Sequence, residues 1–237
     1  MSGSCGVPNV VGGGTGSNVL VYGETDQTIL STSTLMNTGV GLVAACLAAT
    51  GSLSAQVVVY DLHDEVDAGR VRLISATGNG SSSGASVEGY LINDTAAERH
   101  VGIYLSRPIY LRNSGAGQSM IATEVYLGDG GYLSDGRRSF VALSPGVQTR
   151  ILLIAYCVDF QKDNPSASNR MTVGSVPATL NGVMSSIGSY VRANPDADVT
   201  VAAQLAIWLV QDVETTAIRS KFEFTPAGEK LARTFIR

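Results

Sequence analysis

The stretch SFVALSPGVQTRILLIAYCVDF, residues 139–160, predicts two antiparallel β-strands and the turn that joins them. Apolar residues, many of them β-branched or aromatic, fill Ser139–Leu143 and Thr149–Val158, and such residues favour extended backbone. Between the two runs stands Ser144-Pro145-Gly146, which has the proline and glycine of a tight turn. The segment therefore indicates a β-sheet domain whose last strand ends on the pair Tyr156-Cys157.

Shorter runs of the same kind come before this segment. They are Val71–Ser75, Ala85–Asn93, His100–Leu105, Ile109–Leu111 and Met120–Leu127. Turn-forming residues separate them, for example Asn113-Ser114-Gly115 and Gly128-Asp129-Gly130-Gly131. Strands at this short, regular spacing are typical of an antiparallel β-sandwich, and we expect one across residues 70–160.

After Phe160 the apolar period changes from that of a strand to that of a helix. Apolar side chains recur on one helical face at Leu180, Val183, Met184, Ile187, Tyr190 and Val191. A second helix, from about Thr200 to Asp212, is apolar nearly all round, so we expect it to be buried. Thr225-Pro226 has the residue types of an N-cap and first helical position. Residues 161–237 thus predict a small helical subdomain after a mainly β chain.

The first 69 residues differ in character from the rest. Residues 1–18 form a Gly/Ser-rich arm, and short apolar runs follow up to Tyr60, which together predict a β-rich assembly region. The run Val40–Ala49 fits either a strand or a small-residue helix, and it is too short to span a bilayer. Met1–Gly16 has neither the charged nor the apolar part of a secretory signal. We therefore expect no membrane span.

Composition narrows the class of partner. Charged residues make up 15% of the chain, hydrophobic residues 44%, and the net charge is −4. No lysine or arginine precedes Arg70, and this distribution argues against a nucleic-acid partner, since phosphate binding draws on clustered cations. So little charge suits a subunit of an assembly, or equally a β-rich secreted domain with Ser/Thr/Gly-rich faces.

The sequence predicts no enzyme, cofactor or metal site. Cys5, Cys46 and Cys157 are too few and too scattered for a disulfide framework or a zinc site, and His63 and His100 lie far apart. The run Gly80–Gly84 formally matches the nucleophile-elbow pattern G-x-S-x-G. We interpret it as a loop between strands, because it lacks the strand–helix context of that motif and the only later histidine is His100.

The informative pair is a thiol at the end of the last strand and an amide on the buried helix. Cys157 and Gln204 can condense with loss of ammonia to give an internal thioester, an acyl group activated toward amines. The reaction requires that the two groups touch and that water be excluded. Trp208 lies one turn after Gln204 and is expected to wall the site. The alternative is a buried, inert cysteine beside a glutamine that hydrogen-bonds the main chain.

These residues resemble the bacterial thioester domains of surface adhesins across about residues 70–237. That family carries an aromatic–Cys motif at a strand end, matched by Tyr156-Cys157, and a Thr-Gln-x-Ala-Ile/Val-Trp motif on a later helix. Gln204-Leu205-Ala206-Ile207-Trp208 matches the second motif, with Ala203 in place of the threonine. The preceding Gln118 and Met120, followed by a Pro-Gly turn, are also similar to the family's pattern.

The resemblance implies a non-enzymatic adhesion module at the cell surface or outside the cell. Cys157 and Gln204 would form the thioester, and Tyr156, Asp159 and Trp208 would shape its pocket. The partner would be a surface protein or glycan, captured through an amine. The alternative is a self-assembling subunit of an extracellular filament, sheath or shell, whose arm packs on neighbouring copies and whose thioester is not active.

Overall fold

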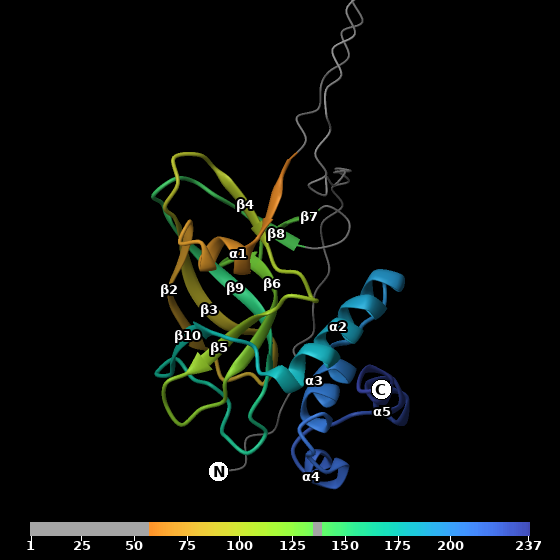
Figure 1. Cartoon of the computed structure of the whole chain (residues 1–237). Helices are drawn as coiled ribbons and strands as arrows, with labels where there is room; N and C mark the ends of the chain where they lie inside the picture. The colour runs from red at the N-terminus through yellow and green to blue at the C-terminus, as the bar shows by residue number, and fades with distance from the viewer. Residues whose placement is uncertain (1–56, 135–138) are drawn as a thin grey trace, which may run out of the picture.

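The computed structural model describes residues 57–134 and 139–237. The described strands are β1 (Val59–Asp61), β2 (Val71–Gly78), β3 (Ser83–Asn93), β4 (Arg99–Gly102), β5 (Ile109–Asn113), β6 (Met120–Leu127), β7 (Leu133–Ser134), β8 (Ser139–Leu143), β9 (Gln148–Cys157) and β10 (Arg170–Gly174). The helices are α1 (Leu62–Asp67), α2 (Ala178–Ala193), α3 (Thr200–Leu209), α4 (Thr215–Arg219) and α5 (Pro226–Phe235). Figure 1 shows the strands gathered on one side and α2 to α5 on the other.

Six antiparallel strands close into a barrel, in the order β10-β2-β3-β9-β6-β5. The long strands β3 and β9 form its backbone and pair from Ser83↔Tyr156 to Ile92↔Gln148. Register shifts between Ala85 and Val87 and between Ala122 and Glu124 mark bulges, which bend strands and let a sheet curl. Alternate side chains of these strands fill the interior, among them Val87, Leu91 and Leu153.

A four-stranded sheet, ordered β1-β4-β8-β7, lies beside the barrel. Its edge strand β1 runs parallel to β4 and leads directly into α1. Leu62, at the start of α1, is buried in the core, and the buried carboxylate of Glu65 is paired with Arg70 and Arg99. Residues 59–67 therefore pack as part of the same unit as the barrel.

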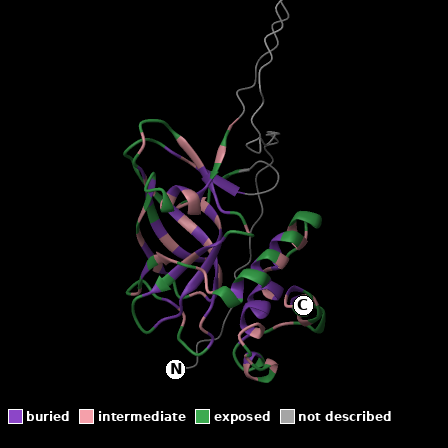
Figure 2. Ribbon diagram, in the orientation of Figure 1, coloured by how far each residue is buried: buried purple, intermediate pink, exposed green. Residues whose placement is uncertain are grey.

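The helices α2, α3 and α5 pack on one another at one end of the barrel, as Figure 2 shows by the buried residues where they meet the strands. Helix α3 is the innermost: every residue from Ala202 to Trp208 is buried. It can be apolar all round because the strands cover it on one side and α5 covers it on the other. Its position brings the middle of a helix against the end of strand β9.

The predicted β-sandwich is wrong, because the strands close into a barrel. The strand β10 makes the difference: it pairs with β2 on one side and with β5 on the other. The sequence did not indicate this strand, since Arg170–Gly174 follows a polar stretch and is short. Inward and outward residues alternate in both architectures, so the alternation that predicts strands cannot distinguish them.

The other predicted elements are largely confirmed. The two helices expected after Phe160 are α2 and α3, and Thr225 caps α5 by accepting a hydrogen bond from the Gly228 N–H. The chain is accordingly a mixed α/β fold of barrel, small sheet and C-terminal helices. The short helices α1 and α4 were not predicted. The Gly-rich arm and Val40–Ala49 lie outside the described residues. Within the described ranges, no helix is long and apolar enough to cross a bilayer.

Candidate functional site

The structure brings Gln204 of α3 against Cys157 at the end of β9. The Cys157 N–H donates to Gln204 Oε1 at 2.9 Å, and Gln204 Nε2 donates to the Cys157 carbonyl oxygen at 2.8 Å. Both residues are fully buried. The amide carbon of Gln204, which is bonded to both of these side-chain atoms, therefore lies directly beside the Cys157 main chain. The two hydrogen bonds also fix which end of the amide is the oxygen.

The Gln204 side chain takes the place of a neighbouring strand. The N–H of Cys157 also donates to the Ser82 carbonyl oxygen at 3.0 Å, just before β3 begins. The same N–H is thus shared between a main-chain carbonyl and the Gln204 carbonyl. Because the amide bonds both polar groups of one strand residue, it imitates the pairing of an added strand and completes the hydrogen bonding of β9 where β3 begins.

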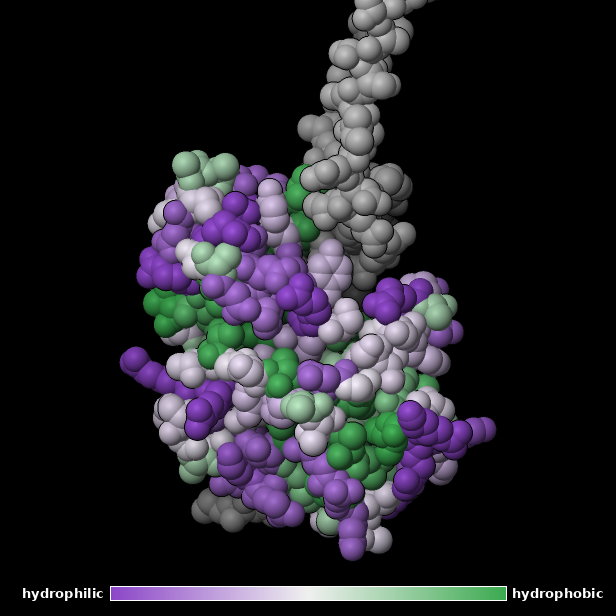
Figure 3. Space-filling view, viewed as in Figure 1, coloured by the Kyte–Doolittle hydropathy of each residue, from purple (hydrophilic) through white to green (hydrophobic). Residues whose placement is uncertain are grey.

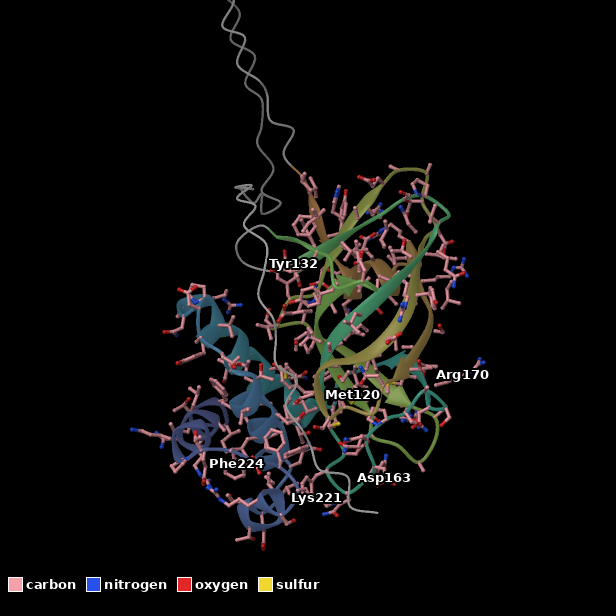
Figure 4. All side chains as sticks on the ribbon, turned by 180° about the vertical axis from the view of Figure 1, so that it is seen from behind. Met120, Tyr132, Asp163, Arg170, Lys221 and Phe224 are labelled. Carbon is pink, nitrogen blue, oxygen red and sulfur yellow. The ribbon has the colours of Figure 1, made fainter. Side chains whose placement is uncertain are left out.

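The thiol of Cys157 lies on the sheet face next to Met120. Cys157 and Met120 are paired residues of β9 and β6, and Cys157 Sγ lies 3.4 Å from Met120 Sδ. Met120 is fully buried and is seen in Figure 4 at the end of the barrel nearest the helices. A methionine side chain is soft and adaptable, so it fills the space around the sulfur without holding it rigidly. The Cys157 thiol is thus packed in the core beside Met120.

Tyr156 lies on the opposite sheet face from Cys157 and contacts the first turn of α3. Its hydroxyl interacts with Thr200 of that turn and with Thr123 of β6. Burial raises the pKa of Tyr156 above its ordinary value, and the nearby Glu124 carboxylate adds to the increase, so the residue is a neutral phenol. Thr200 and Gln204 are four residues apart on one helical face, and neighbouring residues of β9 meet both of them.

Asp159, two residues beyond Cys157, connects the end of β9 to Ser119, the residue just before β6. Its Oδ2 accepts hydrogen bonds from the Ser119 N–H and from Lys162 Nζ, each at 3.0 Å. Burial alone would raise the pKa of Asp159, but these donors outweigh it and hold the pKa below the ordinary value. An ionised carboxylate with two donors is a poor proton donor. The position of Asp159 therefore suits the ordering of this turn rather than acid catalysis.

Trp208 belongs to an aromatic row beside the pair. Its ring packs edge-to-face on Phe160, 5.1 Å between centroids, and on Phe222 at 5.3 Å. All three rings are buried, and Lys221 Nζ lies 4.9 Å from the centroid of Phe160. Figure 4 shows Lys221 among the helices near this end of the barrel. The row covers the turn that follows Cys157 and keeps bulk water from it.

Sequence reasoning missed a second glutamine. Gln211 Nε2 donates to the carbonyl oxygens of Val158 at 3.0 Å and Ile207 at 2.7 Å, so it holds the residue next to Cys157. A signal was present, because Gln204, Trp208 and Gln211 recur at i, i+4 and i+7, and Gln211 lies in the turn just after α3. Nothing in the sequence singles out Ser82, whose contribution is a main-chain carbonyl.

The arrangement supports acyl chemistry without acid–base catalysis. A carbonyl carbon lies beside a thiol-bearing residue, its oxygen accepts a fixed N–H, and the surroundings are apolar. A main-chain N–H aimed at a carbonyl oxygen stabilises the negative charge that develops when a nucleophile attacks. In the described part of the chain, no three histidine, cysteine, aspartate or glutamate side chains converge as a metal site would require.

No protein-family model, no curated protein and no solved structure matches this chain. The resemblance to thioester domains therefore rests on short motifs, and the function is inferred from the geometry around Cys157 and Gln204.

Proposed function

We propose that this chain is a non-enzymatic adhesion module of the cell surface or extracellular space, which captures an amine-bearing partner through a Cys157–Gln204 thioester. The observation that carries the proposal is the pair of hydrogen bonds between the Gln204 amide and the Cys157 main chain, in a fully buried setting. A glutamine held in this way has its amide carbon next to the main chain of Cys157, the residue whose thiol would attack it. Ala203, where the family has threonine, is buried in the same helix.

The chemistry balances within the pair. The sulfur of Cys157 attacks Cδ of Gln204, the C–N bond breaks, and the thiol proton leaves with the amide nitrogen as ammonia. The Cys157 N–H stabilises the oxygen of the tetrahedral intermediate. A partner amine then attacks the same carbon, forms an amide at position 204, and returns the thiol at position 157. No external oxidant or cofactor enters either step.

Burial serves this function because water competes with the amine. A thioester in water hydrolyses and leaves a glutamate at 204, so a useful one must be kept dry until the partner arrives. The fully buried pair and the Phe160–Trp208–Phe222 row meet this requirement. Tyr156 is held as a neutral phenol, which is not a base, and Asp159 is a weak one, because its pKa is lowered and its Oδ2 already accepts from the Ser119 N–H and Lys162 Nζ.

Intact mass of the full chain under denaturing, non-reducing conditions tests the proposal. Without amine, we expect the mass of the unmodified chain less one ammonia. When methylamine is present during unfolding, we expect the mass of this thioester form plus one methylamine. Cys157→Ala and Gln204→Leu should each remove both effects. Gln148→Ala is the matched control, since it removes an exposed amide at the opposite end of β9 from Cys157. A full mass in freshly purified wild-type protein that does not react with methylamine would contradict the proposal.

A second candidate is a self-assembling subunit of an extracellular filament, sheath or shell. It is compatible with an inactive pair, because the Gln204 amide satisfies both main-chain groups of Cys157 and so has a sufficient structural role without a thioester. On this hypothesis the mass is that of the unmodified chain, and polymers form as concentration rises. Deletion of residues 1–18 should then abolish the polymers and leave the circular-dichroism spectrum of the folded domain. Polymers that survive the deletion would count against this role of the arm.

A further inference from the structure

A second site lies away from the Cys157–Gln204 pair, where three segments meet. The segments are α1, the connection between β4 and β5, and the connection from β10 into the first turn of α2. They line a cavity of about 520 Å³ that is open to solvent, and we name it the α1 cleft. Its polar lining residues are His63, Asp67, Ser106, Arg107, Ser175 and Asn181. This volume falls within the range of small-molecule sites.

The charged side chains of the α1 cleft are held in place by one another. Arg107 makes a two-pronged contact with Asp64, NH1 to Oδ2 at 2.8 Å and NH2 to Oδ1 at 2.7 Å. His63 Nδ1 lies 3.2 Å from Asp67 Oδ2, one helical turn away. A planar guanidinium fixed at two points presents its remaining N–H groups in a set direction. The polar wall is therefore arranged before any ligand arrives.

The loop that carries Arg107 rests firmly on α2. A Cβ at Gly188 would lie 3.1 Å from Leu105 Cβ and from the Ser106 nitrogen, so the helix and the loop are in close contact there. The Arg107 N–H also donates to the Tyr104 carbonyl oxygen at 2.8 Å and closes a tight turn. The cleft is thus bounded by packed elements on two sides.

The charges of the cleft disfavour an anion, and the Arg107 guanidinium in its wall disfavours a cation. Arg107 and Asp67 cancel if histidine is counted as neutral, and Asp64, the partner of Arg107, adds a negative charge behind the wall. An anion would meet this carboxylate and an arginine already paired. An apolar ligand would leave the cleft's polar groups without partners. A neutral ligand with many hydroxyl groups meets neither penalty.

We propose that the α1 cleft binds an uncharged carbohydrate. The Asp67 carboxylate accepts from sugar hydroxyls, Arg107 donates to them, and the Asn181 amide does both. Pro108, Val173 and Val176 form the apolar part of the wall, against which the C–H face of a sugar ring packs. This site is separate from the thioester pair and does not depend on it. On a surface module, it would give the chain a reversible contact with a glycan.

Titration of the isotope-labelled full chain by ¹H–¹⁵N NMR tests the proposal. The probes are the methyl glycosides of glucose, galactose, mannose and N-acetylglucosamine, each added up to tens of millimolar. We expect at least one of them to shift the amide signals of His63, Ser106, Val176 and Asn181 along a saturating curve. Cross-peaks of Cys157 and Gln204 should stay in place.

Two variants in the cleft test the assignment. Asn181→Ala and Asp67→Asn should each weaken binding about five- to tenfold, the effect expected when one or two hydrogen bonds to a ligand are lost. Asn181 and Asp67 are both exposed, so neither change threatens the fold. Gln148→Ala, an exposed residue at the start of β9, is the matched control and should bind as wild type.

Three results would overturn the proposal. One is the absence of any saturating shift with all four glycosides, and another is a set of shifted residues elsewhere on the surface. The third is saturating binding of phosphate or acetate in the cleft without binding of a glycoside, which would show an anion site instead.

Discussion

The Cys157–Gln204 pair and the α1 cleft are two polar sites that the same fold treats in opposite ways. The pair is fully buried, neutral and enclosed by apolar and aromatic side chains. The cleft is open and lined by a histidine, a carboxylate and a guanidinium. Figure 3 shows hydrophilic and apolar residues interspersed on the face it presents, as expected for a surface on which such open polar sites lie. The difference indicates two modes of binding, one covalent and dry, the other reversible and wet.

The largest expected effect concerns the enclosure of the pair. Trp208→Ala removes a buried ring between Phe160 and Phe222 and should lower the free energy of unfolding by about 3–5 kcal/mol. Val147→Ala removes apolar atoms from an exposed position and should change it by less than about 0.5 kcal/mol. Urea denaturation of the two variants measures both. Equal losses would mean that Trp208 does not seal this region.

A smaller effect should distinguish two aspartates by pH. Hydrogen bonds hold the pKa of Asp159 below its ordinary 3.8, despite burial. Folding therefore favours its ionised form, and this stability is complete above about pH 3.8 and is lost as pH falls through the folded-state pKa. Burial raises the pKa of Asp61, next to α1, against the N–H of His63 and the charge of Arg107. For Asp61, the stability is complete below about pH 3.8 and is lost as pH rises through the folded-state pKa.

Asp159→Asn and Asp61→Asn should therefore change the pH profile of stability in opposite directions. Relative to wild type, Asp159→Asn should be less stable at pH 7 than at pH 3, and Asp61→Asn should be relatively more stable at pH 7. Asparagine retains a cap for α1 in the second case. Thermal unfolding across this range measures the slopes, and slopes of equal sign would contradict the assignment.

The smallest effect is expected at the cleft's ion pair. Asp64 and Arg107 are about half exposed, so Asp64→Asn should cost less than about 1 kcal/mol despite the two-pronged geometry. The loss should shrink further in 1 M salt, where the Debye length is about 3 Å. The loss caused by Trp208→Ala should not shrink, because no charge is involved. If the loss caused by Asp64→Asn did not change with salt, the interaction between Asp64 and Arg107 would not be the screened, solvent-exposed ion pair described here.

Individual residues show how far sequence reasoning reached. The helices α2 and α5 were predictable because their signals are local, a one-sided apolar period in the first and Thr225-Pro226 in the second. The sandwich was predicted wrongly because the strand that closes the barrel, Arg170–Gly174, has little strand character of its own. It is a strand because β2 and β5 each leave an edge that it pairs with. Such pairing between distant segments is not encoded in any one of them.

The candidate site divides in the same way. Cys157 and Gln204 could be proposed as partners from their chemistry, but the sequence could not show that the Gln204 amide binds the Cys157 main chain at both ends. The role of Gln211 could have been inferred from helical spacing, whereas the shared carbonyl of Ser82 could not. The α1 cleft was invisible, since its polar residues come from three segments far apart in the chain.

The sequence by itself determined where strands and helices form and which side chains carry reactive groups, because these depend on residue type and on neighbours a few positions away. Only the tertiary structure decided that the strands close into a barrel, that the sulfur-bearing strand end meets the glutamine of a buried helix, and that a cleft opens beside α1. The physical reason is that contacts between distant segments are set by the packing of the whole chain, in which each face is buried against whatever else remains uncovered.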